Sequence, residues 1–265
     1  MRNQHFSIVF KAVRERYRVV WIYDGSFEGF LTALYRTYTS KTIPDKLTKE
    51  ISTISLLDEC ITIETDLEIA SSVSKRIGKY FPKKMQERMA HVFLCDDLSF
   101  EVDLLLYIRM GFKNIQLMQN LSHPIIYAIE GYQKRLLSTV HKMDAFTRFE
   151  MLEDGTLYAK IAPPRNVLPL IGRHFVKRLK KERFIMHDIK RSLIAVSDGK
   201  TLELYPILEA SEPKVHSEEL HFQKLWKNFF DNVAIESKQN YTLQRSYIPL
   251  LYRGLMTEFK DEPTK

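Results

Sequence analysis

The residues best suited to chemistry lie in the segment HDIKR, where His187 and Asp188 are adjacent and Arg191 follows closely. A histidine beside a carboxylate can act as a general base. Consecutive residues of a β-strand point to opposite faces, so this pair interacts only if the chain turns there. Two interpretations stay open. In the first, which we favour, Asp188 stabilises a turn; in the second, the segment binds an anion or a nucleotide.

Asp24 is a further candidate for chemistry. It precedes Gly25 in the segment WIYDGSFEGF, between an expected strand and an expected helix, where many enzymes place an active carboxylate. An Asp before a Gly also stabilises turns, and we favour that role. The candidate catalytic residues are therefore His187, Asp188 and Asp24, and the sequence identifies no catalytic set outright.

Motifs that bind cofactors or metals are missing from the sequence. It contains no phosphate-binding loop, no dinucleotide glycine fingerprint and no nucleophile elbow. Its histidines do not have the spacing of metal ligands. Cys60 and Cys95 are the only cysteines, which leaves no disulfide framework and too few thiolates for the cluster of a radical enzyme. The sequence therefore predicts neither a cofactor nor a metal, and any radical chemistry would belong to a partner.

Positive charge is concentrated between Lys160 and Arg191. This segment holds ten Lys or Arg and two acids, which gives it a net charge of +8. The net charge of the whole chain is +7, so the remaining residues carry a net charge of about −1. Concentrated positive charge beside β-hairpin sequence is typical of an anion-binding surface, most often one for nucleic acid. The distribution of charge therefore indicates a class of partner but no reaction.

Within this segment the spacing predicts a helix over residues 166–181. Leu168, Ile171 and Phe175 fall on one side of it, and the cations fall on the opposite side. Contacts with phosphates would release counterions and give a salt-sensitive, sequence-independent attraction. The alternative is a solvated helix face without a ligand. The predicted nucleic-acid contacts are Arg173, Lys177, Lys180, Lys181, Arg183, Lys190 and Arg191.

The elements around these residues predict an α+β protein. Residues 1–144 form a mainly helical region with a short strand at Val19–Ile22. Residues 145–208 form a ββαβββ unit, a small antiparallel sheet with one packed basic helix, and residues 209–265 form a C-terminal helical segment. The three stretches could belong to one integrated domain.

Local signals place several element boundaries. Ser26 is expected to cap a helix, Thr65 and Glu68 form a capping-box pattern, and Asn166 is expected to cap the basic helix. Residues 146–152 are strand-like. A C-terminal helix is expected to contribute an apolar stripe to the core, at Phe222, Leu225, Trp226, Phe229, Phe230 and Val233.

Composition narrows the class of protein. Hydrophobic residues make up 45% and charged residues 28% of the chain, which is typical of a soluble globular protein. No segment is apolar over the length of a membrane span, and the first residues lack the apolar core of a signal peptide. We therefore expect a cytoplasmic protein without a membrane partner.

Four segments, in the same order along nearly the whole chain, resemble a bacterial family of probable DNA metabolism proteins, a domain of unknown function. They are WIYDGSFEGFLTALYRTY, HKMDAFTRFEMLEDGTLYAKIAPPRNVL, RFIMHDIKRSLIAVSDG and QNYTLQRSYIPLLYRGLMTEF. The matched positions that are candidates for function are Tyr23, Asp24, Gly25, His141, Arg148, His187, Asp188 and Arg191.

The resemblance implies a context rather than a mechanism. Members of that family accompany a radical S-adenosylmethionine protein that carries DNA-binding elements and is linked to DNA modification or repair. A similar region precedes uracil-DNA-glycosylase-like domains in some longer proteins, but no such domain is present here, so glycosylase activity is not expected.

Charge and resemblance together favour a DNA-binding accessory protein that works with such a radical enzyme in DNA repair or modification. One alternative is an enzyme that processes nucleic acid or nucleotides with His187 and Asp188, or with Asp24. The other is a protein-interaction adaptor whose basic face contacts an acidic partner.

Overall fold

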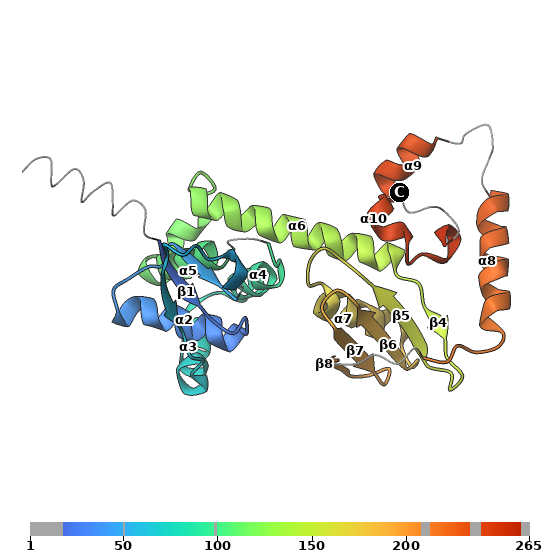
Figure 1. Cartoon of the computed structure of the whole chain (residues 1–265), viewed down its shortest axis with the longest axis horizontal. Coiled ribbons are helices and arrows are strands. Elements are labelled where there is room, and N and C mark those ends of the chain that lie inside the picture. The colour runs from blue at the N-terminus through green and yellow to red at the C-terminus, as the bar shows by residue number, and fades with distance from the viewer. Residues whose placement is uncertain (1–17, 50, 98–99, 208–212, 234–239, 261–265) are drawn as a thin grey trace, which may run out of the picture. The chain divides into compact units, whose positions relative to one another are not determined.

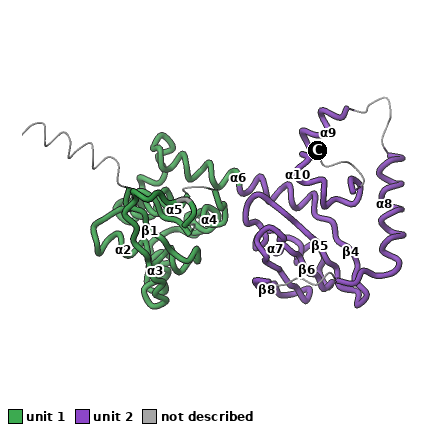
Figure 2. Tube along the Cα trace, in the orientation of Figure 1, with its two compact units in different colours: residues 1–135 green, residues 136–265 purple. Residues whose placement is uncertain are grey.

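The computed structural model describes residues 18–49, 51–97, 100–207, 213–233 and 240–260 (Figure 1). The segment on which the signal-peptide prediction rests lies largely outside these ranges. The protein is α+β, as predicted, and divides into two compact units, residues 1–135 and 136–265 (Figure 2). No helix within the described ranges combines the length and the apolar composition needed to cross a membrane.

The first unit contains a three-stranded parallel sheet in the order β2-β1-β3. β1 (Val19–Ile22) is the central strand, between β2 (Lys46–Thr48) and β3 (Glu59–Thr62). Its sequence VVWI is a continuous apolar run, which suits a strand with neighbours on both sides. The prediction of β1 is confirmed, whereas β2 and β3 were not predicted because both are short and carry polar residues.

Helices cover this sheet. They are α2 (Phe27–Thr39), α3 (Leu67–Tyr80), α4 (Lys83–Leu94) and α5 (Phe100–Lys113). A 3₁₀ turn, η2 (Ile115–Gln119), follows, and α6 (Pro124–Phe146) holds the last residues of the first unit and the first of the second. Aromatic side chains of α2, α4 and α5 pack edge to face, with the ring centroids of Phe27 and Phe93 5.0 Å apart.

The helix caps only partly follow the predictions. The Ser26 hydroxyl accepts a hydrogen bond from the Gly29 N–H, so the predicted cap of α2 is confirmed. The predicted capping box at Thr65 is wrong: the next residue, Asp66, caps α3 by accepting bonds from Glu68 and Ile69 N–H groups. A carboxylate is the stronger acceptor for these free N–H groups.

The second unit contains a five-stranded sheet in the order β4-β5-β6-β7-β8. The strands are β4 (Glu150–Met151), β5 (Leu157–Ile161), β6 (Phe184–Asp188), β7 (Leu193–Ser197) and β8 (Leu202–Pro206). The prediction of a purely antiparallel sheet is wrong, because the sheet is mixed. β5 and β6 run parallel because the helix between them carries the chain back to the same end of the sheet. β4 is shorter than the predicted strand because α6 continues to Phe146.

The crossover helix α7 (Leu168–Leu179) packs on one face of this sheet (Figure 1). Leu168, Ile171 and Phe175 are buried, as the helical wheel predicted. The helix begins after Val167, without a side-chain cap, so the predicted Asn166 cap is wrong. It also ends earlier than predicted because Lys180 has a φ of 55°, which a continuing helix does not allow.

The C-terminal part of the second unit comprises α8 (Glu219–Val233), α9 (Tyr241–Tyr247), α10 (Leu250–Arg253) and a 3₁₀ turn, η4 (Thr257–Phe259). Glu258 joins η4 to α8 and to the segment between α6 and β4, since its carboxylate accepts bonds from Trp226 Nε1 at 3.1 Å and Arg148 Nη2 at 2.6 Å. The predicted core stripe of α8 is wrong, because Phe222 and Phe229 are 51% and 58% exposed.

Two turn glycines provide a matched test of how closely the turn between β7 and β8 packs against the backbone of Lys181. Gly199 and Gly155 both have φ near +80°, at 87° and 80°. A Cβ on Gly199 would lie 2.7 Å from the Lys181 carbonyl carbon, whereas a Cβ on Gly155 would meet nothing within 4 Å. Gly155→Ala should cost about 1 kcal/mol through its backbone conformation. Gly199→Ala should cost at least about 1 kcal/mol more because the methyl meets backbone. Urea unfolding measures both, and equal losses would contradict the packing.

Candidate functional site

The structure does not join His187 and Asp188 into a catalytic pair. Both lie on β6 and both are buried. The His187 Nδ1 shares a hydrogen bond of 2.9 Å with the Tyr158 hydroxyl. Burial lowers the pKa of His187, and Lys160 lowers it further, while Asp188 has a weaker opposite effect. Burial therefore favours the neutral form of His187, whose imidazole is bonded to Tyr158 of the neighbouring strand β5.

Asp188 stabilises the turn between β6 and β7. It is 0% exposed, and its Oδ1 accepts bonds from the N–H groups of Lys190 at 3.1 Å and Arg191 at 3.3 Å. Burial raises the pKa of its carboxyl, although Arg191 and these N–H groups act in the opposite direction. This geometry matches the turn-stabilising role that the sequence favoured.

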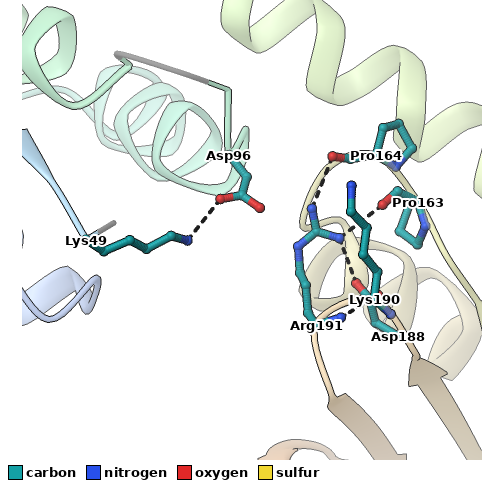
Figure 3. A network of polar contacts seen from close by, with 7 residues as sticks. All are labelled: Lys49, Asp96, Pro163, Pro164, Asp188, Lys190 and Arg191. Atoms are coloured by element: carbon teal, nitrogen blue, oxygen red, sulfur yellow. Dashed lines mark hydrogen bonds and ion pairs between the residues drawn. The ribbon is translucent and has the colours of Figure 1, made fainter. Parts of the chain in front are cut away.

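Arg191 links this turn to the segment that leads into α7. Its Nη1 donates to Asp188 Oδ2 and to the Pro163 carbonyl, each at 3.0 Å, and its Nη2 donates to the Pro164 carbonyl at 3.1 Å (Figure 3). Its side chain is only 12% exposed. The guanidinium thus has a structural role, which leaves little of it exposed to a phosphate.

The other predicted contacts are exposed cations on α7 and its flanking turns. Arg173 and Lys177 are four residues apart on α7 and point away from its buried side. We call the following six residues the α7 surface: Arg173, Lys177, Lys180, Lys181, Arg183 and Lys190. None of these six forms an ion pair with an acid in the described part of the chain.

The α7 surface is a strip rather than one cluster. Lys180, Lys181 and Arg183 precede β6, whereas Lys190 follows it at the opposite end of the sheet. Since a strand rises about 3.3 Å per residue, the five residues of β6 separate these groups by roughly 16 Å. Arg173 and Lys177 lie between them on α7. The strip is therefore long enough to meet several successive phosphates.

Lys200 is a neighbour of this strip that the sequence analysis missed. It belongs to the β7–β8 turn, and Gly199 of that turn lies against the carbonyl groups of Lys180 and Lys181. Asp198 shapes the turn by accepting bonds from the N–H groups of Lys200 and Thr201. Lys200 falls outside the basic segment, and only the strand register brings it here, so no local signal could have identified it.

Asp24 lies just beyond the carboxyl end of β1, where ligands often bind to parallel sheets. Its carboxylate accepts bonds from the Ser26 N–H at 2.9 Å, the Ser26 hydroxyl at 2.6 Å and the Thr65 hydroxyl at 2.8 Å. Desolvation acts to raise its pKa, but these bonds outweigh it and hold the pKa below the ordinary value. A general base for neutral pH needs a raised pKa. The geometry gives Asp24 a structural role at this turn.

The remaining matched positions take separate places. Gly25 has a φ of 81° in the turn after β1, and Tyr23 is buried beside it. His141 is exposed on α6, and Arg148 is paired with Glu258. These residues do not form one site within either unit, and among the described residues no group of three or more His, Cys, Asp or Glu side chains could hold a metal ion.

Glu101 is a titratable residue that the sequence analysis did not single out. It lies in the first turn of α5 and is 8% exposed. Burial raises the pKa of its carboxyl from 4.5 to about 7, and Lys49, Lys46 and Asp96 act on it electrostatically. In the sequence it is simply an acid in a first helical turn, a common position, so only its burial marks it.

These features define an α+β protein with exposed cations on α7 and in the turns before and after β6 of a mixed sheet. A family model described as a domain of unknown function (DUF4130) matches residues 100–258, more than half of the chain. The chain therefore belongs to that family. The matched range includes the whole α7 surface and excludes Asp24. No curated protein matches the chain. No solved structure matches it either.

The Asp188–Arg191 pair should be essential for stability. Asp188→Ala or Arg191→Ala removes the ion pair and leaves the opposite charge buried without its neutralising partner charge, so each should cost about 3–5 kcal/mol in the free energy of unfolding. Lys190→Ala, a change in the same turn at an exposed side chain, should cost less than about 0.5 kcal/mol. Urea denaturation measures all three, and similar values for Asp188→Ala and Lys190→Ala would refute the assignment.

Glu101 should make stability depend on pH. Its pKa is raised in the folded state, so the folded protein binds this proton more tightly than the unfolded chain. The contribution of Glu101 to stability is then largest below pH 4.5 and is lost as the pH rises through about 7, by on the order of 3 kcal/mol. Glu101→Gln should remove this loss, so unfolding curves of both proteins at pH 5 and pH 8 test it. A wild-type to variant difference that does not change with pH would contradict it.

Proposed function

We propose that this protein binds DNA through the α7 surface and serves as an accessory protein in DNA repair or modification. The observation that carries the proposal is the strip itself: six exposed cations without ion pairs to described acids. Two of them lie on a helix whose other side is buried, and four lie in the turns before and after β6. A face that serves only solubility usually mixes its charges. A polyanion supplies the missing negative charge.

The chemistry of the strip suits phosphates rather than base edges. Lysine presents a point charge on a flexible stem and neutralises phosphates without reading sequence. Each phosphate contact contributes about −0.9 to the slope of log K against log salt. Binding through the strip should accordingly be salt-sensitive and largely independent of sequence.

The accessory role follows from what the candidate catalytic residues do. His187 and Asp188 are bonded to Tyr158 and Arg191, and Asp24 is bonded to Ser26 and Thr65. Each has a structural role that accounts for it. The resemblance adds a radical S-adenosylmethionine enzyme as the partner, and in this proposal that enzyme supplies the chemistry while this chain holds DNA.

Charge reversal on the strip tests the proposal. Arg173→Glu, Lys177→Glu and Lys181→Glu together should weaken binding to duplex DNA at least tenfold and lower the salt slope by roughly 3. Fluorescence anisotropy with a labelled duplex at several salt concentrations measures both quantities.

The matched control reverses three exposed lysines of the first unit, Lys83, Lys84 and Lys134, and changes the net charge equally. It should keep most of the affinity. If both triple variants lose the same affinity, the attraction comes from net charge and the α7 surface is not the site. Absence of DNA binding by the wild-type protein, together with capture of an acidic protein partner by the same strip, would favour the adaptor instead.

A further inference from the structure

The first unit contains a cavity that has no role in the proposed DNA binding by the α7 surface. α2, α3, α5 and the segment leading into α6 line an open cavity of about 870 Å³. Ligand pockets commonly measure about 300–1,000 Å³. Every residue that lines the cavity belongs to the described part of the first unit. The cavity is therefore large enough for a whole small molecule and belongs to one unit alone.

Aromatic rings form much of its wall. Tyr38 of α2, Tyr80 of α3 and Phe112 of α5 all line it. Tyr80 and Phe112 have ring centroids 5.4 Å apart, and Tyr38 and Tyr80 are 45% and 47% exposed. Soluble proteins bury most aromatic surface, so rings left open around a cavity offer planar faces on which another ring can stack.

The charged groups of the cavity are all basic. Arg76, Arg109 and Lys113 line it, and none of the described lining residues is acidic. None of these three cations forms an ion pair with a described acid. The cavity thus combines apolar rings with unneutralised positive charge, and an anion would complement it.

Arg109 is fixed in position before any ligand arrives. Its Nη1 donates to the Thr37 hydroxyl at 2.5 Å, and its guanidinium lies 4.3 Å from the ring centroid of Tyr38. Thr37 is fully buried and donates in turn to the Leu34 carbonyl. Arg76 lies 5.9 Å from the ring centroid of Phe112 in the same way. Cations held against rings keep their orientation, which lowers the entropic cost of binding an anion.

We propose that this cavity binds a nucleotide, with the base against the tyrosine and phenylalanine rings and the phosphate at Arg76, Arg109 and Lys113. Stacking of a base on an aromatic side chain contributes about 1–3 kcal/mol, and arginine binds phosphate through two parallel bonds. The nucleotide can be free or part of a single strand, since both present the same ring and phosphate. The proposal does not depend on the α7 surface, which belongs to the other unit.

Calorimetry with the full chain and dAMP tests the site. dAMP should bind, and deoxyadenosine or inorganic phosphate alone should bind at least tenfold more weakly, because each lacks one half of the recognised chemistry. Arg76→Ala with Lys113→Ala should weaken dAMP at least tenfold. Lys75→Ala with Lys79→Ala, two exposed α3 lysines that do not line the cavity, should change it less than twofold. Thermal unfolding confirms that both double variants fold.

The source of the nucleotide is decided with a (dA)6 strand, measured in the protein whose α7 surface carries the three charge reversals. If (dA)6 binds more tightly than dAMP and this binding is lost with Arg76→Ala and Lys113→Ala, the ligand of the cavity is a single strand. If the two bind equally, the ligand is a free nucleotide. The proposal is overturned if neither ligand binds, if the cavity variants bind dAMP as well as wild type, or if octanoate, an anion without a ring, competes equally with dAMP. Loss of duplex binding through the α7 surface leaves dAMP binding unchanged, so the two proposals fail separately.

Discussion

The buried ion pair between Asp188 and Arg191 is the interaction on which the second unit depends. Removing a carboxylate from water is costly, and Asp188 is 0% exposed. Two backbone N–H groups and a guanidinium satisfy it, and the same guanidinium donates to Pro163 and Pro164. One side chain therefore joins the β6–β7 turn to the start of the crossover that becomes α7. That connection holds the segment before the basic helix against the turn.

The remaining features of α7 build on this anchor. Leu168, Ile171 and Phe175 bury one side of the helix, and Gly172 leaves room for Leu202 of β8. With the inner side fixed, Arg173 and Lys177 of α7 face outward. Like charges on one face repel one another, and burial of the apolar side offsets that repulsion. A bound polyanion would neutralise these charges and remove the repulsion. Binding a ligand of opposite charge would therefore stabilise this surface.

The sequence predicted elements whose signals are local. β1, α2 and α7 were found because apolar runs and helical stripes are visible along the chain. β2 and β3 were missed because each has three or four residues and gains stability only by pairing with β1. The positive charges of the strip could be predicted, but the contacts of each cation could not. Arg191 and Lys190 are alike in the sequence. Only the fold shows that Arg191 is largely buried against Asp188 and that Lys190 is exposed. Glu101 and the cavity in the first unit depend on packing in the same way.

The central claim is that the α7 surface contacts DNA, and lysine footprinting tests it most directly. The wild-type protein is treated with an amine-acetylating reagent, with and without duplex DNA, and modification is measured at each lysine by mass spectrometry. The account predicts protection of Lys177, Lys180, Lys181 and Lys190, with Lys83 and Lys84 of the first unit unchanged as internal controls. Equal modification of the strip lysines with and without bound DNA would contradict it.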